Sequence, residues 1–515
     1  MKTGTQQKSG RRVLMIGLDA AEITLVEQWM GEGAMPHLRA LREGGAFARL
    51  ESTAKWLVGS PWPSFYTGTT PSEHGLYHYL QWRPDLMAAV RPAPDWLPLQ
   101  PFWRELAEYR RVVAIDVPLT YAPRDFGGVE VCGWATHETL QAPCTTPQSL
   151  MARVVGEFGA PPLGNEQARL LSAGELLEIR DQCIRSAGLS ASLALELMRW
   201  QPWDLFIVCL AATHRAGHQL WDLSNMAGQA EAQQAEQLGD ALKRVYAACD
   251  EAVGSLVREA GSDVVIMVFS LHGMGVNVSR VELLGEMLAR VLADRSGPRS
   301  RRWGNDLLER LRAMTPSRLR SSVKGRLPYG WQDRLTQFWR TGGLDWDTTR
   351  AFAQFSDLDG YIRVNLRGRE SAGIVEPGAE YEKLCARIAE GLATFADDRS
   401  GEPLVQSIAR PDDLYAHGRR TPYLPDLMVR WSDQPAVGHR AIVSPRYGSI
   451  AWPTPGRHPQ GRSGNHRPDG FLIVGGGSAA ARLGVSDPHI LDLAPTAYQL
   501  LGLTIPPQMR GRALL

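Results

Sequence analysis

The chain alternates short apolar runs with longer stretches of helical character, which is the pattern of an α/β protein whose sheet carries helices on both faces. The runs are apolar at successive positions rather than at every second one, as is typical of strands that are covered on both sides. We predict five buried strands, over residues 13–19, 112–118, 205–212, 264–270 and 471–476. Because ligands bind beyond the carboxyl ends of the strands in such sheets, the polar residues that follow these runs are the first candidates for chemistry.

A basic segment interrupts this pattern. Residues 295–340 contain 12 Lys or Arg and three Asp or Glu, with Pro, Gly and Ser among them. We therefore predict a basic helical insertion over residues 291–343, which serves either as a solvated surface or as a contact for an anionic substrate or partner. An alternating strand and a helix then predict a cap subdomain over residues 344–435. The core would be built from residues 11–290 and 436–515.

Composition narrows the class of protein. With 515 residues, 44% of them hydrophobic, the chain can form one large domain with an insertion, or two domains. Its 56 Lys and Arg balance 55 Asp and Glu, so we expect neither a nucleic-acid nor a membrane partner. The N-terminal apolar run is too short for a secretory signal, and no run of 18 apolar residues follows, which predicts a soluble cytoplasmic protein. The six scattered cysteines lack a CxxC spacing, which argues against a disulfide framework or a thiolate zinc site.

Four histidines and one aspartate lie at or beside the ends of predicted strands. His214 and His218 are four residues apart in HRAGH, a spacing that directs both imidazoles toward one point on a helix and suits a zinc-like ion. Asp19 ends the strand in GLDA, His272 follows a strand in SLHGMG, and His466 lies in the loop GNHRPDG. Each has a simpler alternative, since Asp is a common helix cap and single histidines are often hydrogen-bonded core residues. Taken together, the five residues predict the metal site of a metallohydrolase.

The segment VGSPWPSFYTGTTPSEHG supplies a candidate nucleophile. Ser60 precedes Pro61 at a predicted helix start, where backbone N–H groups can hold a phosphate-like anion and lower the pKa of a hydroxyl. The alternative is that Ser60 only caps this helix. We expect His74, later in the segment, to fix the following loop rather than to bind metal.

The order of these motifs resembles the type I phosphodiesterase and nucleotide pyrophosphatase family of the alkaline phosphatase superfamily. The resemblance covers nearly the whole chain outside the basic insertion, through GLDA, MPHLRALREGGAFARLEST, WPSFYTGTTPSEHG, HRAGHQLWD, SLHGMG, GNHRPDG and DLAPTAYQLLGL. It implies an alkaline phosphatase-like three-layer α/β/α sandwich with a central, mostly parallel sheet and an inserted cap region. It also implies a two-metal, zinc-type site and a Ser or Thr nucleophile that forms a covalent intermediate.

Carried over to this sequence, the resemblance implies that Asp19 and His272 bind one metal together with the nucleophile. His218 and His466 would bind the other metal. The predicted cofactor is therefore a divalent metal, with zinc as the first choice and manganese or iron as alternatives.

Three positions depart from the family pattern. His214 stands where the family has Asp, and Leu271 replaces the Asp that precedes the HG histidine. The usual nucleophile position is Val58, and the nearest hydroxyl is that of Ser60, two residues later. One carboxylate in place of three leaves about two units less negative charge, so a second divalent ion would bind more weakly.

These departures leave the number of metals and the reaction open. A single metal held by His214, His218 and His466, with an open position, is an alternative to two metals and would need no protein nucleophile. We consider three functions: hydrolysis of phosphate esters or phosphodiesters through Ser60, a mononuclear enzyme that acts on a different ester or as a transferase in a specialised pathway, and a non-catalytic member that binds a phosphorylated ligand.

The sequence says less about the substrate. A small phosphorylated molecule is expected, and Arg363 and Arg367 in GYIRVNLRGRE are predicted to reach its anionic group from the cap. Asn465, next to His466, is a further candidate for substrate binding or for hydrogen bonding behind the metal ligands. The sequence leaves open whether the protein forms a homodimer.

Overall fold

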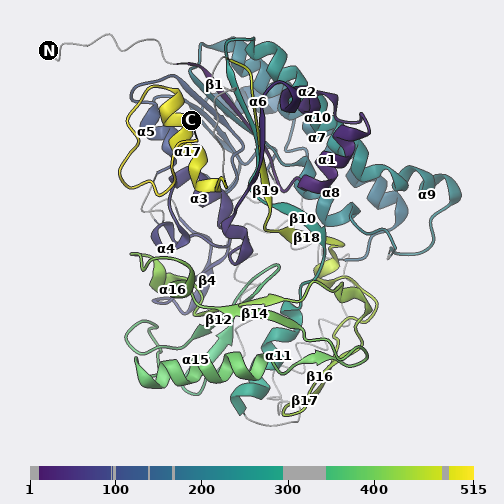
Figure 1. The fold of residues 1–515 in the computed structure, drawn as a ribbon, viewed down its shortest axis with the longest axis vertical. Helices are drawn as coiled ribbons and strands as arrows, with labels where there is room; N and C mark the ends of the chain where they lie inside the picture. The colour runs from purple at the N-terminus through teal and green to yellow at the C-terminus, as the bar shows by residue number, and fades with distance from the viewer. Residues whose placement is uncertain are drawn as a thin grey trace.

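The computed structural model describes residues 11–93, 96, 100–123, 125–136, 140–164, 169–224, 226–293, 344–477 and 487–514. These residues form a core around a large sheet and a cap with smaller sheets, which lie one above the other along the longest axis of the molecule (Figure 1).

The core is built on an eight-stranded sheet. Five neighbouring strands are parallel, in the order β9, β1, β8, β5 and β6. Strand β19 runs antiparallel to β9 and to the edge strand β2, and β7 runs antiparallel to β6 at the other edge. All five predicted strands are present, and the mostly parallel α/β sheet is confirmed. In sheet order the strands are β2 (Ala46–Leu50), β19 (Gly470–Gly475), β9 (Val265–Ser270), β1 (Val13–Leu18), β8 (Leu205–Leu210), β5 (Val112–Ile115), β6 (Val129–Cys132) and β7 (Cys144–Thr146).

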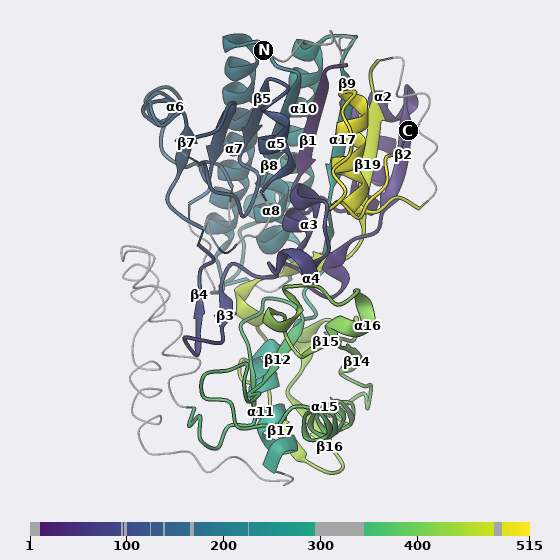
Figure 2. The same ribbon diagram turned by 90° about the vertical axis from the view of Figure 1, so that its left-hand side faces the viewer.

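Helices cover both faces of this sheet, as its continuous hydrophobicity predicts. Successive residues of β1 point to opposite faces, so that Leu14 and Ile16 pack on one side and Val13 and Met15 on the other. The first face carries α1 (Ile23–Gly31), α2 (Pro36–Glu43), α6 (Leu150–Phe158), α7 (Ala173–Trp200), α8 (Ala212–Leu220) and α10 (Ala241–Ala260). The second face carries α3 (Pro61–Thr67), α5 (Phe102–Leu106) and α17 (Leu493–Leu500), which stand in front of the sheet in Figure 2.

The cap has its own apolar core between two small sheets and two helices. The predicted strand and helix of this region correspond to β12 and α15. Its elements are α11 (Val281–Ala293), α15 (Ala379–Leu392), the sheet β11 (Ala351–Ala353), β12 (Gly360–Val364), β15 (Leu427–Trp431) and β14 (Val405–Ala409), and the sheet β13 (Ala396–Asp397), β16 (Ala441–Ser444) and β17 (Gly448–Ala451).

The cap extends beyond residue 435. Residues 436–515 were assigned to the core, but β16 and β17 pair with β13 in the cap, so the chain returns to the core only afterwards. The predicted basic insertion, residues 291–343, lies outside the described residues except for its first three, which end α11.

A two-stranded ribbon joins core and cap at the carboxyl edge of the large sheet. It pairs β10 (Gly273–Val276) with β18 (Gly464–Arg467), and this pairing sets His466 opposite Met274. Strand β18 also packs very closely on α8, because a Cβ at Gly464 would lie only 2.1 Å from the carbonyl oxygen of Gly217. Glycine is therefore required at position 464 for the ribbon to reach this helix.

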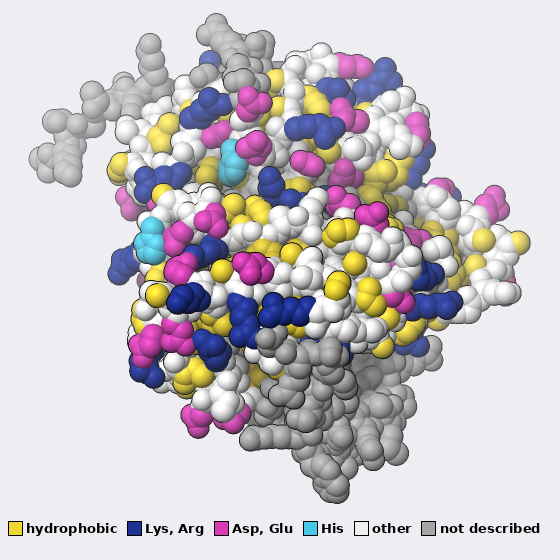
Figure 3. Space-filling model, turned by 60° about the horizontal axis from the view of Figure 1, so that its bottom comes forward, with side chains coloured by type: hydrophobic (Ala, Val, Ile, Leu, Met, Phe, Trp, Pro, Cys, Tyr) yellow, Lys and Arg dark blue, Asp and Glu magenta, His cyan; other side chains and the backbone are white. Residues whose placement is uncertain are grey.

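Charges on the cap are mixed. Lys and Arg side chains lie among Asp and Glu side chains on the face shown in Figure 3. The cap also has surface ion pairs, such as Arg350 with Glu380 at 2.6 Å and Arg410 with Glu382 at 2.6 Å. Among the described helices, none has both the length and the apolar character needed to cross a bilayer.

Candidate metal centre

Four histidines meet at the carboxyl edge of the large sheet. His214 and His218 lie one turn apart on α8, which begins directly after β8, while His272 follows β9 and His466 lies on β18. The ring centre of His466 is 4.7 Å from that of His214, 4.9 Å from that of His218 and 4.7 Å from that of His272. None of the four side chains is more than 8% exposed. The structure thus brings together histidines that are up to 252 positions apart in sequence, since residues 214 and 466 differ by that number.

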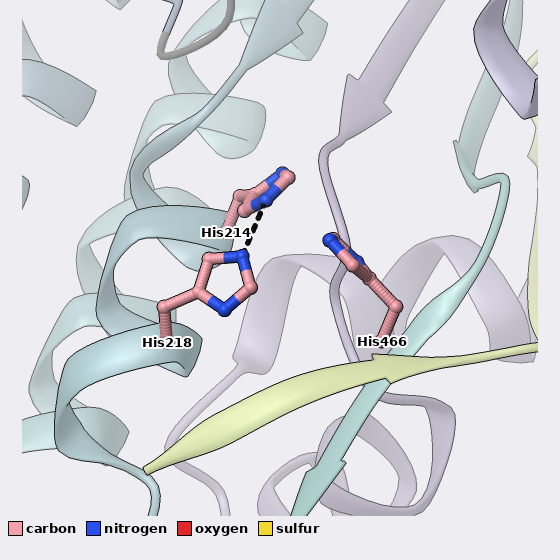
Figure 4. Close-up of side chains that lie close together, drawn as sticks. All are labelled: His214, His218 and His466. Atoms are coloured by element: carbon pink, nitrogen blue, oxygen red, sulfur yellow. Dashed lines mark hydrogen bonds between the residues drawn. The ribbon is translucent and has the colours of Figure 1, made fainter. Parts of the chain in front are cut away.

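Three of these histidines form a group that could hold a metal ion. His214, His218 and His466 each offer one ring nitrogen, and these nitrogens all lie within 4.8 Å of one another. In Figure 4 the rings converge from α8 and from β18. Three imidazoles that leave one position open are a common ligand set of catalytic zinc.

The hydrogen bonds of His214 and His218 determine which nitrogens face the centre. His218 Nδ1 donates to the carbonyl oxygen of Gly464 at 2.9 Å, and His214 Nδ1 lies 2.8 Å from Asp19 Oδ2. With a proton on each Nδ1, both Nε2 atoms present lone pairs, and they are 3.0 Å apart. Two lone pairs at this distance repel each other unless a proton or a cation lies between them.

His466 adds a third nitrogen and favours a metal over a proton. Its Nδ1 is buried and has no hydrogen-bond partner among the described residues. A buried polar atom without a partner costs about 1–3 kcal/mol. A divalent metal held by these three histidines would satisfy such a nitrogen and would offset the repulsion between the two facing Nε2 lone pairs, so the donor set fits a divalent metal.

Burial keeps His218 and His466 in the neutral form that binds metals. The pKa of His218 lies well below its usual value because of burial, with smaller contributions from the charge of Arg462 and from His214 and His466. The pKa of His466 is also well below its usual value, through burial, the neighbours His214 and His272, and Arg462. Neutral imidazoles need not lose a proton before they bind a metal.

Asp19 links the histidines to α3. Its Oδ2 contacts His214 Nδ1, and its Oδ1 accepts a hydrogen bond from Trp62 Nε1 at 2.8 Å. His272 Nε2 is 3.9 Å from Asp19 Oδ1. A carboxylate behind a metal-binding histidine fixes the tautomer and orientation of the ring. The geometry therefore gives Asp19 this orienting role, and direct ligation of a metal by Asp19 and His272 stays a prediction.

Comparison with known proteins identifies the family. The sequence matches the model of the type I phosphodiesterase / nucleotide pyrophosphatase family over residues 13–434. The chain belongs to this family.

Similarity to a solved structure supports the predicted fold. Phosphonoacetate hydrolase from Sinorhizobium meliloti 1021, in complex with phosphonoformate, superposes with a TM-score of 0.52 and 14% identity, covering 97% of this chain and 98% of that one. Murine ectonucleotide pyrophosphatase / phosphodiesterase 5 gives a TM-score of 0.48 and 11% identity, covering 96% of each chain. No curated protein sequence matches the chain. The predicted alkaline phosphatase-like fold is confirmed.

At the usual nucleophile position of this phosphodiesterase family the chain has an apolar residue, Val58, which packs against other apolar side chains. Val58 is 7% exposed and lies against Val278 and Leu358, while its N–H donates to the hydroxyl of Tyr361 at 3.2 Å. Leu271, in place of the family's Asp, is buried in the core. Neither side chain can bind a metal or attack a substrate.

Ser60, the nearest hydroxyl, is held by the protein itself. The residue is fully buried at the N-terminus of α3, which begins at Pro61 as predicted. Its Oγ lies 2.6 Å from the carbonyl oxygen of Leu57 and 2.7 Å from Thr53 Oγ1. These internal hydrogen bonds do not favour Ser60 as a nucleophile, and that role stays a prediction.

His74 belongs to the same segment and has a structural role. Its Nδ1 accepts from the N–H of Leu76 at 3.0 Å, so the ring proton is on Nε2, which lies 3.0 Å from Ser64 Oγ. Burial lowers the pKa of His74 to about 3. The ring fixes the loop after α4 (Pro71–His74), in line with the sequence analysis, and cannot accept a proton from Ser64.

Arg363, predicted to reach a substrate, is enclosed in the cap. It is fully buried, and its Nε pairs with Glu370 at 2.7 Å. Its two terminal nitrogens donate to the carbonyl oxygens of Leu424 and Pro422 at 2.5 and 2.7 Å. With all three nitrogens engaged away from solvent, Arg363 has a structural role in the cap rather than an open path to a substrate.

The other two residues predicted to bind substrate also interact with other residues of the chain. Arg367 lies on the surface and pairs with Glu376. Asn465 is fully buried, donates to the carbonyl oxygen of Asp357 at 3.0 Å and accepts from the N–H of His466 at 2.9 Å. Asn465 therefore positions β18 and the histidine that follows it.

One basic residue near the centre, Arg462, is not among the residues predicted from the sequence. Arg462 precedes β18, and its positive charge contributes to the lowered pKa of both His218 and His466. Its NH1 is 3.6 Å from Asp357 Oδ1, and Asp357 Oδ2 is 3.1 Å from His78 Nε2. Nothing in the sequence distinguishes Arg462 from other arginines, because its position depends on contacts between core and cap.

Proposed function

We propose that this family member is a metal-dependent hydrolase of phosphate esters or phosphodiesters that binds one divalent metal at His214, His218 and His466. Water, rather than a protein side chain, would attack the phosphorus. The observation that carries the proposal is the pair of facing Nε2 atoms 3.0 Å apart with a third buried ring nitrogen beside them.

Residues of the chain hold this centre in place before any ligand arrives. Asp19 orients His214, and the carbonyl oxygen of Gly464 orients His218. When bound, a divalent metal at such a site is a Lewis acid that activates water and neutralises oxyanion charge. Three neutral imidazoles suit zinc better than manganese, which prefers oxygen ligands.

The positive charge of Arg462 near the centre supports the proposal that the substrate is anionic. His218 and His466, whose pKa values lie well below the usual one, provide no positive charge of their own, whereas the Arg462 guanidinium is permanently charged. Arg462 is held by Asp357 and lies close enough to affect His218 and His466. We infer that it attracts and orients the phosphoryl group.

The lack of a nucleophile at position 58 supports water as the attacking group. A covalent route needs an activated hydroxyl beside the metal, and Val58 and Leu271 supply neither a hydroxyl nor a ligand. The hydroxyl of Ser60 is engaged with the backbone of Leu57.

Activity assays on variants test this proposal. Ser60→Ala should hydrolyse p-nitrophenyl phosphate or bis-p-nitrophenyl phosphate at a rate close to that of wild type, whereas His218→Ala should lose activity. His458→Ala, which removes another buried histidine, is the matched control and should remain active. A loss of several orders of magnitude in Ser60→Ala, as expected when a nucleophile is removed, would contradict water as the attacking group.

A further inference from the structure

Two cysteines face each other at the edge of the large sheet that lies opposite to β2. Cys132 ends β6 and is paired directly with Cys144, which begins the edge strand β7. Directly opposite residues of antiparallel strands place their side chains on the same face, with Cα atoms about 4.5–5.5 Å apart. Disulfides span Cα distances of about 4.4–6.8 Å. The backbone therefore already has a spacing that a disulfide can bridge, although both thiols are free in this structure.

The two thiols differ in environment, which gives them different roles. Cys144 is partly exposed, and its Sγ accepts a hydrogen bond from Gln141 Nε2 at 2.8 Å. The pKa of Cys144 is lowered, first by the hydrogen bond from the Cys132 thiol and also by that from Gln141. Cys132 is only 2% exposed, lies 3.4 Å from Thr120 Oγ1, and has a pKa raised by burial. An accessible thiol with thiolate character beside a second thiol is the arrangement of an attacking and a resolving cysteine.

We propose that Cys132 and Cys144 form a reversible redox site that is oxidised to a disulfide by small-molecule disulfides. The Cys144 thiolate attacks one sulfur of the small disulfide, whose S–S bond breaks and releases one thiolate. The Cys132 thiol then gives up its proton, and its sulfur attacks Cys144 Sγ, which releases the second small thiol. In sum, two protein thiols become one disulfide and one small disulfide becomes two small thiols.

The other four cysteines do not share these features. Cys183, Cys209, Cys249 and Cys385 are no more than 3% exposed. Burial raises the pKa of Cys183 to about 12 and that of Cys385 to about 11. We therefore expect oxidation to be selective for the pair, and this expectation is independent of the function proposed for the metal centre.

Peptide mapping of the folded, full-length protein tests the proposal. The protein is incubated with oxidised glutathione, free thiols are alkylated, and a protease that cleaves after Glu138 separates the two cysteines. We expect a linked peptide pair whose mass is that of the two peptides less two hydrogens. This pair should disappear after treatment with dithiothreitol. Recovery of both cysteines as alkylated thiols, or as separate glutathione adducts, would overturn the proposal.

Variants add a control for specificity. Cys144→Ser should abolish the linked peptide and leave Cys132 as a free thiol, whereas Cys385→Ser should form the link as wild type does. A link from Cys132 to another cysteine in Cys144→Ser would count against the proposed pairing. If Cys144→Ser does not fold, the wild-type peptide map still decides the outcome.

Discussion

His214 Nε2 and His218 Nε2 lie 3.0 Å apart while the other nitrogen of each ring is already engaged, with Asp19 Oδ2 and with the carbonyl oxygen of Gly464. The protein thus fixes two lone pairs toward one point. This arrangement is favourable only with a positive charge between the rings, and it is the physical basis of the proposed metal centre.

Asp19→Asn should weaken metal binding. Loss of the carboxylate behind a metal-binding histidine typically lowers affinity by about 10–100-fold. Zinc affinity can be measured by competition with a chromogenic chelator. Asp250→Asn, which alters a buried carboxylate that accepts from the N–H groups of His37 and Leu38, is the control and should leave affinity unchanged. If Asp19 instead binds a second ion directly, the number of metals in wild type should be two and should fall to one in the variant.

Arg462→Met should weaken the binding of anions. Removing a charged hydrogen-bonding partner costs about 1.5–3 kcal/mol, which corresponds to roughly 10–100-fold in affinity. The inhibition constant of inorganic phosphate or vanadate measures this effect, and Arg462→Lys should restore part of it. Arg457→Met, an exposed arginine of the same segment, serves as the control. Equal inhibition of wild type and Arg462→Met would show that Arg462 does not contact the anion.

Gly464→Ala should destabilise the protein and disturb the centre. Its Cβ would lie 2.1 Å from the carbonyl oxygen of Gly217, so β18 must move away from α8. Overpacking of this kind costs about 1–3 kcal/mol in the free energy of unfolding. Gly188→Ala, in the exposed middle of α7 with open space around it, should instead stabilise by up to about 1 kcal/mol. Urea denaturation should show a lower free energy of unfolding for Gly464→Ala and a higher one for Gly188→Ala. A Gly464→Ala protein as stable as wild type would disprove the close packing.

His74 should make stability depend on pH. Burial lowers its pKa to about 3, whereas an unfolded chain exposes the ring, whose ordinary pKa is about 6.5. Between these values the unfolded state binds more protons, so the free energy of unfolding falls as the pH decreases from about 6.5 toward 3. His74→Asn should reduce this dependence, whereas substitution of the exposed His417 should not. An unchanged slope in thermal melts of His74→Asn across this range would contradict the role of burial.

Local patterns were enough to predict much of the fold. Continuous apolar runs indicated strands covered on both sides, and the four-residue spacing of His214 and His218 indicated a shared direction on a helix. Both features depend on neighbouring residues only. The pairing of β16 with β13 depends on register between distant segments, so no local pattern indicates that the chain beyond residue 435 still pairs with a cap strand.

The roles of single polar residues were harder to predict. Arg363 was expected near a substrate because it is basic and lies in the strand-like segment GYIRVNLRGRE of the cap, but Glu370 and two carbonyl oxygens enclose it. Arg462 was missed because its importance comes from Asp357, which approaches from the cap. A sequence shows which side chains can bind a ligand, whereas the partners that occupy them are set by tertiary packing.

The metal content of the zinc-reconstituted protein tests the central claim most directly. Elemental analysis after removal of loosely bound ions should give about one zinc per chain, as expected for a three-histidine site. His218→Ala should lose this zinc, and Ser60→Ala should retain it. Two tightly bound ions per chain, or one ion that survives the loss of His218, would contradict a single centre at His214, His218 and His466.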